Sequence, residues 1–105
     1  MRQLAISLAV ICLTACADRG VADVTLAQLV AQQGDYDGRR VVVAGTLRSH
    51  PDPLHYWIED ETYHRVELDP AGELSGREGE QVTVRGVFRY HRDRGRRIEI
   101  TSFDY

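Results

Sequence analysis

The chain lacks lysine, an excess of basic residues and any hydrophobic run long enough to cross a membrane. All 13 basic side chains are arginine, and 16 acidic side chains outnumber them, giving a formal net charge of -3 at pH 7. The longest apolar run, Leu4 to Ala15, has 12 residues, whereas a transmembrane helix needs about 20. These shortages argue against a transmembrane anchor and against a protein that binds nucleic acid through a generally basic surface.

The N-terminal segment has the features of a lipoprotein signal. Arg2 supplies a positive charge, the apolar run follows, and Leu13-Thr14-Ala15-Cys16 places small residues before a cysteine, where a signal peptidase needs room. The segment resembles the bacterial lipoprotein class, in which cleavage leaves the cysteine at the new N-terminus with a diacylglyceryl group on its thiol. The resemblance implies lipid attachment at Cys16; an ordinary secretory signal with a chance cysteine is the alternative.

The same resemblance implies a place in the bacterial cell envelope. Two or three acyl chains on Cys16 hold a protein firmly, because each buried methylene contributes about 0.8 kcal/mol. In the sorting rule of this class, aspartate directly after the cysteine retains the protein at the inner membrane. That position is Ala17 here, with Asp18 one residue later. We therefore expect an outer-membrane anchor with the domain facing the periplasm.

Cleavage before Cys16 defines the expected organisation as a signal peptide at 1–15, a lipidated tether at 16–23 and one domain at 24–105. Cys12 leaves with the signal, so no cysteine remains for a disulfide or a thiol active site. Losing Arg2 leaves 12 basic and 16 acidic side chains, a net charge of -4. A domain of about 80 residues buries only about 60% of its unfolded surface and needs an efficient, closed core.

The hydrophobic pattern predicts one short helix followed by five strands. Leu26, Leu29 and Val30 share a helical face, Asp23 or Thr25 can cap its start, and Gly34 has the position of a left-handed C-terminal residue. The period then becomes two. The predicted strands centre on 40–49, 56–58, 66–68, 81–90 and 97–103, with a hairpin turn at Arg94-Gly95 before the last.

A sequence echo links the first and fourth predicted strands. The pattern Gly-x-x-Val-x-Val-x-Gly occurs at 38–45 and returns 41 residues later at 79–86. A glycine within a strand suits a sharp bend or a bulge at the corner of a barrel. Five short strands, two of them bent at glycine, predict a mainly β protein with a small closed barrel.

The chain at this point resembles the bacterial OB-fold proteins over about residues 24–105. The run Asp37-Gly38-Arg39-Arg40-Val41-Val42-Val43-Ala44-Gly45 is similar to their first strand, and 79–86 to their fourth. The resemblance implies a five-stranded OB-like barrel, here with one short N-terminal helix. Typical members place a helix between strands three and four, but 71–79 has room for at most one turn. An SH3-like barrel is the alternative.

Trp57 is the first candidate ligand-binding residue. If Tyr56 and Ile58 face the core, Trp57 points outward, in a neighbourhood that contains Arg48, Arg65, His55 and Glu59. The OB-fold resemblance implies that ligands lie on the outer face of strands two and three, often on aromatic side chains. The interpretation that the sequence favours is that Trp57 lies under the N-terminal helix, whose apolar face must pack somewhere, and an open aromatic surface is the alternative.

A cluster of arginines near the last hairpin is the second candidate. The segment 85–97 contains one acid, Asp93, and six arginines: Arg85, Arg89, Arg92, Arg94, Arg96 and Arg97. Arg89, Arg92 and Arg94 are candidate contacts to an anionic ligand, because guanidinium groups bind carboxylate and phosphate in a planar, bidentate way. The interpretation that the sequence favours is a self-neutralising hairpin in which the arginines pair with Glu99 and Asp93, and an anion-binding tip is the alternative.

No other constellation predicts chemistry. The four histidines, 50, 55, 64 and 91, lack zinc-like spacing. Glu59-Asp60-Glu61 lacks a calcium-binding loop, and no nucleophile motif or cofactor-binding motif is present. We expect no metal, no cofactor and no enzymatic activity. The predicted function is a binding module for an envelope protein or polysaccharide. The alternatives are a small hydrolase using histidine and carboxylates at the barrel mouth, and an oligonucleotide-binding domain.

Overall fold

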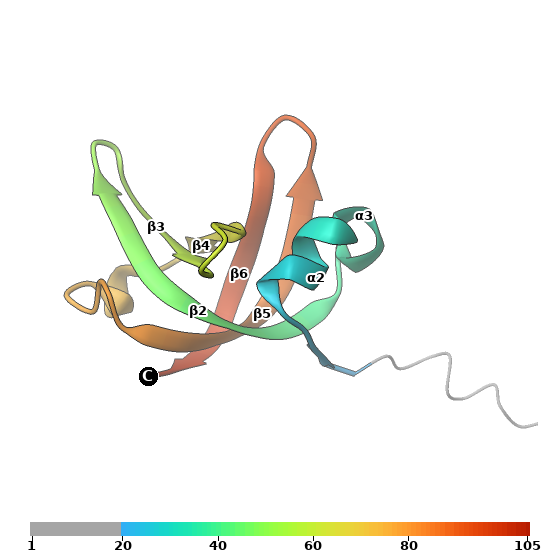
Figure 1. Cartoon of the computed structure of the whole chain (residues 1–105), viewed down its shortest axis with the longest axis horizontal. Helices are drawn as coiled ribbons and strands as arrows, with labels where there is room; N and C mark the ends of the chain where they lie inside the picture. Colours follow the sequence, from blue (N-terminus) through green and yellow to red (C-terminus); the bar gives the residue numbers. More distant parts are fainter. Residues whose placement is uncertain (1–19) are drawn as a thin grey trace, which may run out of the picture.

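The computed structural model describes residues 20–105, so the expected signal peptide and Cys16 lie outside the described part. The chain is mainly β, with six strands in one sheet and two short α-helices (Figure 1). In chain order the elements are β1 (Ala22–Asp23), α2 (Leu26–Ala31), α3 (Gln33–Tyr36), β2 (Arg40–Pro51), β3 (Leu54–Glu59), β4 (Arg65–Asp69), the 3-10 turn η1 (Gly72–Leu74), β5 (Gln81–His91) and β6 (Gly95–Asp104). Within 20–105, no helix has the length and apolar character to cross a membrane.

Five of the strands pair in a closed ring. The order is β2-β3-β4-β6-β5, and β5 pairs back to β2. Strand β2 takes part twice, because residues 40–46 pair with β5 while residues 46–51 pair with β3. All neighbours in the ring are antiparallel except β4 and β6, which are parallel. The five predicted strands are therefore confirmed.

Two glycines let neighbouring chain segments approach closely where the long strands curve. A Cβ atom on Gly45 would lie 2.9 Å from Leu26 Cδ1 and 3.0 Å from Ile58 Cβ. On Gly86 it would collide with the carbonyl oxygen of Glu99. The β5–β6 register also shifts beside Gly86, leaving Thr101 as an extra residue. Only glycine fits such contacts, and the extra residue forms a bulge that bends its strand.

The core fills the inside of the ring and is closed by α2. Along residues 40–47 of β2 and 81–88 of β5 every second residue is buried, as the alternation predicts. Thr25 and Gln28 form a capping box at the start of α2, and Leu26 and Leu29 are buried in the common core. The buried side chains of the ring are Val41, Val43, Leu47, Tyr56, Ile58, Val66, Leu68, Val82, Val84, Phe88 and Ile98.

The N-terminal region differs from the expectation in two respects. Gly34 is not a left-handed helix end: α2 ends at Ala31, and Gly34 lies within the second helix, α3. The left-handed glycine is Gly38, with φ 86°, one turn later. Residues 22–23, expected in a tether, form β1 and pair parallel to β2. A strand of two residues has no detectable period, so alternation does not predict it.

Candidate functional site

Five outward side chains form a row across the ring. Cross-strand pairing places Arg48 opposite Trp57 and Trp57 opposite Glu67. It continues from Glu67 to Arg97 and from Arg97 to Arg89. Because alternate residues face opposite sides of a sheet, these residues lie on the face away from the core. We call Arg48, Trp57, Glu67, Arg97 and Arg89 the outward row.

Trp57 is half-buried by its own neighbours on this face. The Arg65 guanidinium carbon lies 3.9 Å from the centroid of the Trp57 ring. Trp57 Nε1 donates a hydrogen bond of 2.9 Å to Glu59 Oε1, and the His55 ring lies beside it at 5.3 Å between centroids. The helix takes another position, because Leu26 packs by the inner side chain of Ile58. Trp57 is therefore covered by a cation and not by α2.

Ion pairs hold the first part of the row in place. Arg48 Nε lies 3.2 Å from Glu59 Oε2, so Glu59 binds both Arg48 and Trp57. Arg65 Nη2 lies 2.9 Å from Glu67 Oε2. The aromatic side chain thus lies among two arginines and two carboxylates with defined partners. This arrangement provides a flat, amphipathic surface with planar donor groups at its margin.

The arginine hairpin is only partly self-neutralised. Glu99 accepts hydrogen bonds from Arg97 and Arg89, each at 3.3 Å, and these bonds, first that from Arg97, lower the pKa of Glu99 below its ordinary value. Arg92 and Arg94 make no ion pair or hydrogen bond through their side chains within 20–105, nor does Asp93. The predicted pairing with Glu99 is thus confirmed, and that with Asp93 is wrong.

A concave surface lies beside this hairpin. A pocket of about 270 Å³ is lined by Asp37, Arg89, Tyr90, His91, Arg94, Gly95 and Arg97. Nε of Arg97 is buried without a hydrogen-bond partner in the described part. An anion that enters this pocket meets guanidinium groups with unused donor capacity. The chemistry of the lining therefore favours a carboxylate, phosphate or sulfate group.

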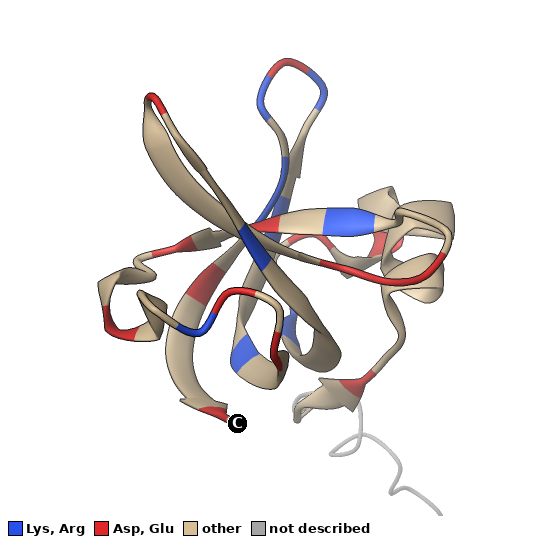
Figure 2. Cartoon of the chain, turned by 60° about the vertical axis from the view of Figure 1, so that its left-hand side comes forward, with Lys and Arg blue, Asp and Glu red and all other residues tan. Residues whose placement is uncertain are grey.

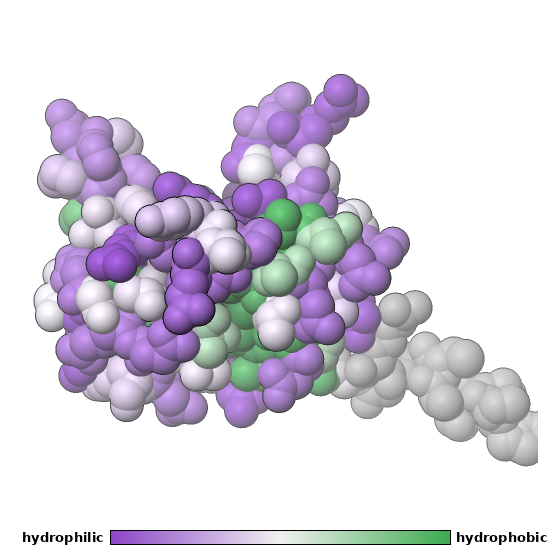
Figure 3. Space-filling view, viewed as in Figure 1, coloured by the Kyte–Doolittle hydropathy of each residue, from purple (hydrophilic) through white to green (hydrophobic). Residues whose placement is uncertain are grey.

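Two hairpins with different charge flank the site. The β2–β3 and β5–β6 hairpins are separate hydrophilic projections with a gap between them on the surface (Figure 3). The β2–β3 tip has an acidic residue, Asp52, whereas arginines flank Asp93 at the β5–β6 tip (Figure 2). A pocket of about 520 Å³ has lining residues from both hairpins, including Leu54, His55 and Arg94. This pocket thus joins His55, whose ring lies beside Trp57, to Arg94 and Arg97 of the arginine hairpin.

Within the described residues, no hydrogen bond joins the histidines His55 and His64 to Glu59 or Glu61, and the histidine–carboxylate pair that forms is His64 with Asp60. His55 Nδ1 lies 2.7 Å from the Pro53 carbonyl oxygen, and His64 Nδ1 lies 2.8 Å from Asp60 Oδ2. Burial alone raises the pKa of Asp60, but hydrogen bonds from His64 and Thr62 outweigh it and lower the pKa. Within 20–105, no group of three His, Cys, Asp or Glu side chains could hold a metal ion.

Sequence reasoning found most of the site but missed two members of the outward row. It named Trp57, Arg48, Arg65, His55, Arg89, Arg92 and Arg94, which the structure distributes between the outward face and the arginine hairpin. It assigned no role to Glu67 and named Arg97 only as part of the cluster. Alternation along β4 and β6 marks both as outward, but their proximity depends on a parallel pairing that no local pattern reveals.

The chain matches no protein-family model, and no curated protein shows significant similarity to it.

Proposed function

We propose that this chain is a lipid-anchored envelope protein whose OB-like barrel binds an anionic group on an envelope protein or polysaccharide. The observation that carries the proposal is the outward row, which continues from Trp57 to the arginine hairpin. A single surface thus combines an aromatic side chain with guanidinium donors. Surfaces of this kind recognise ligands by stacking and by charge-assisted hydrogen bonds.

The free arginines support an anionic ligand. Arg92 and Arg94 have exposed side chains at the hairpin tip, without partners in the described part, while Arg89 and Arg97 share one carboxylate. An incoming carboxylate or phosphate can bind the free guanidinium groups without breaking an existing ion pair. The overall negative charge of the chain then selects against a long polyanion such as nucleic acid.

The ring of strands supports the OB-like description. Its neighbour order, its long curved first strand and its two glycine bends agree with a small closed barrel. A ligand surface on β3 and β4, between two projecting hairpins, is also what that fold would supply. Fold alone does not fix the ligand, and the choice of an anion rests on the arginines.

The lipid anchor is tested separately from the binding surface. Cells are labelled with a radioactive fatty acid, and the native chain is compared with Cys16→Ser and with a Cys12→Ser control. We expect label on the native chain and on Cys12→Ser only. Label that persists on Cys16→Ser would contradict the lipoprotein assignment.

The anion surface is tested with a matched pair of arginine variants. Arg92→Gln/Arg94→Gln removes the two free cations of the hairpin tip, whereas Arg85→Gln removes an exposed cation elsewhere on β5. The probes are purified peptidoglycan sacculi in a sedimentation assay and detergent-solubilised envelope proteins in a capture assay. We expect the double variant to lose binding about tenfold, or ~1.4 kcal/mol, with Arg85→Gln unchanged. Equal binding by all three proteins would refute the proposed surface.

A further inference from the structure

The second half of β6 has an unpaired edge. Strand β4 pairs with β6 only through residues 67–69 opposite 97–99, whereas β6 continues to Asp104. On its other side β6 remains paired with β5 as far as Asp104 opposite Thr83. Among residues 20–105, no strand pairs with 100–104 on the β4 side. An unpaired edge presents backbone donors and acceptors to an incoming strand.

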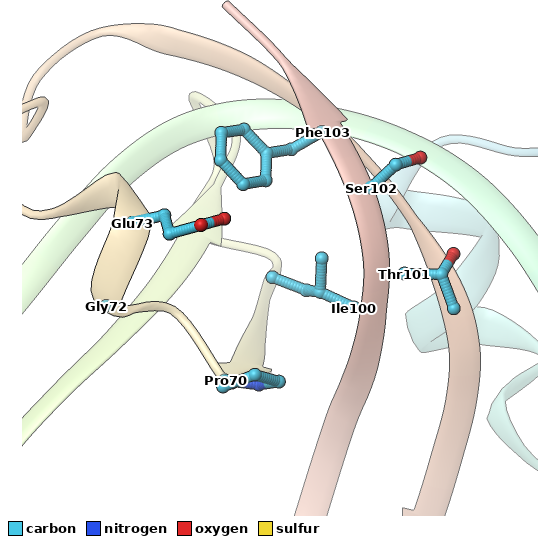
Figure 4. A pocket seen from close by; sticks show the side chains of 7 residues that line it. All are labelled: Pro70, Gly72, Glu73, Ile100, Thr101, Ser102 and Phe103. Carbon is cyan, nitrogen blue, oxygen red and sulfur yellow. The ribbon is translucent and has the colours of Figure 1, made fainter.

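A pocket lies along this edge. It has a volume of about 610 Å³ and is bounded by residues 100–103 of β6 and by the connection that leaves β4 at Pro70. Ile100 and Phe103 point from β6 toward Glu73, whereas Thr101 and Ser102 point away (Figure 4). Ile100 and Phe103 are only half-buried and pack against the core. The pocket thus has apolar walls and one carboxylate at its opening.

The charge around the pocket is acidic. Glu73, Asp69 and Asp104 make no side-chain hydrogen bond or ion pair within the described chain. One cation lies near this end of β6: the Arg77 guanidinium carbon is 3.2 Å from the centroid of the Tyr105 ring, which stacks on Phe103. Arg77 is itself paired with Glu80 at 3.1 Å, so its charge is already neutralised. A lysine or arginine side chain matches the pocket, because its aliphatic stem can lie on apolar groups while its charged head reaches a carboxylate.

The bulge at Thr101 leaves the edge usable. The hydroxyl group of Thr101 donates to the Arg85 carbonyl oxygen at 3.2 Å, which ties the extra residue to β5. Regular pairing with β5 resumes at Ser102 and extends through Phe103 to Asp104. The backbone of these residues is therefore held extended on one side while its other side stays open.

We propose that this edge binds an extended, basic segment of a partner protein by β-strand addition, with a lysine or arginine side chain in the pocket beside Glu73. Backbone hydrogen bonds supply affinity in this binding mode, and pockets for alternate side chains supply specificity. The β6 edge site, defined as residues 100–104 with Glu73, is distinct from the outward row and does not depend on it.

Backbone methylation of a probe peptide tests strand addition directly. The probe is a short peptide of alternating threonine and valine with one central arginine, titrated into the isotope-labelled full chain in detergent. Two further probes have N-methyl groups on every second residue, one on the odd-numbered and the other on the even-numbered residues. The bound peptide uses the N–H groups of only one of its two edges to pair with β6. We therefore expect one methylated probe to lose binding and the other to keep it. We also expect the amide signals of 100–104 to shift.

Charge reversal at the pocket tests the basic side chain. Glu73→Arg should weaken the unmodified probe about tenfold, ~1.4 kcal/mol, while Glu61→Arg, at an exposed acid on the β3–β4 turn, and Trp57→Ala leave it unchanged. Strand addition would be overturned if both methylated probes bind, if neither of them binds, or if the unmodified probe does not bind. A Glu73→Arg protein that binds normally would overturn the basic side chain. Self-association through this edge, seen by sedimentation, would show a second copy as the occupant and refute the proposal.

Discussion

The guanidinium carbon of Arg65 lies 3.9 Å from the centroid of the Trp57 ring, on the face of the sheet away from the core. The contact follows from chain geometry, because β3 and β4 form an antiparallel hairpin that places Glu59 opposite Arg65. The guanidinium group of Arg65 therefore covers one face of the Trp57 ring. A ligand on this surface therefore either displaces Arg65 or binds beside it.

Replacing Trp57 should affect binding more than folding. Trp57→Ala removes a cation–π contact worth about 0.5–1 kcal/mol at an exposed site, so the melting temperature should fall by about 2–8 °C. Partner capture should weaken about tenfold, ~1.4 kcal/mol. Tyr63→Ala, at an aromatic residue that is 76% exposed, serves as the control. A collapse of stability with unchanged capture would show that Trp57 is a structural residue only.

Phe88 should be indispensable to the fold. Its side chain is fully buried inside the ring, and truncation of a buried phenylalanine to alanine costs about 3–5 kcal/mol. A domain of this size has a total stability of about 5–8 kcal/mol. We expect Phe88→Ala to be marginal or unfolded in urea denaturation. An unchanged midpoint would place Phe88 at the surface and contradict the register of β5.

Gly86 and Gly72 form a matched pair for the close approach of β5 to β6. A Cβ atom at Gly86 would collide with the Glu99 backbone, whereas one at Gly72 meets nothing within 4 Å. We expect Gly86→Ala to lower the free energy of unfolding by about 2–3 kcal/mol, and Gly72→Ala to change it by less than about 0.5 kcal/mol. Equal stability of the two variants would contradict the close approach.

Acid should weaken the arginine hairpin through Glu99. Hydrogen bonds from Arg97 and Arg89 lower the pKa of Glu99 in the folded chain. The stability that it contributes is therefore present above the ordinary pKa of glutamate and is lost as the pH falls through the lowered value. We expect the melting temperature of Glu99→Gln to fall less than that of the native chain when the pH is lowered from about 6 to about 3. Glu61→Gln should behave like the native chain, and an identical profile for Glu99→Gln would contradict the assignment.

The sequence was informative where burial imposes a period. Val41, Val43 and Leu47 alternate with less buried neighbours, so the long strands and their inward faces could be predicted. The mid-strand glycines also indicated bends, because only a close approach explains glycine there. Two-residue β1 and the second helix around Gly34 have no such period. Their conformations depend on contacts with distant strands.

The candidate site was predictable to the same degree. Alternation placed Trp57 and the arginines on the outer face, but it left their mutual distances open. The approach of Arg97 to Glu67 depends on parallel pairing between strands separated by 25 or more residues. Whether Trp57 lies under α2 or on an open surface depended on tertiary packing. The structure shows a third arrangement, in which Arg65 covers the Trp57 ring.

The measurement that tests the binding surface most directly is site-specific photo-crosslinking in intact cells. A photoreactive residue is introduced at His55 or at Arg94, which flank the outward row, or at Ser75 and Glu61 as exposed control positions. We predict that a discrete crosslinked adduct forms at His55 and Arg94 and at neither control position. Adducts at the control positions alone, or at all four positions equally, would contradict the claim that the outward row and the arginine hairpin contact the partner.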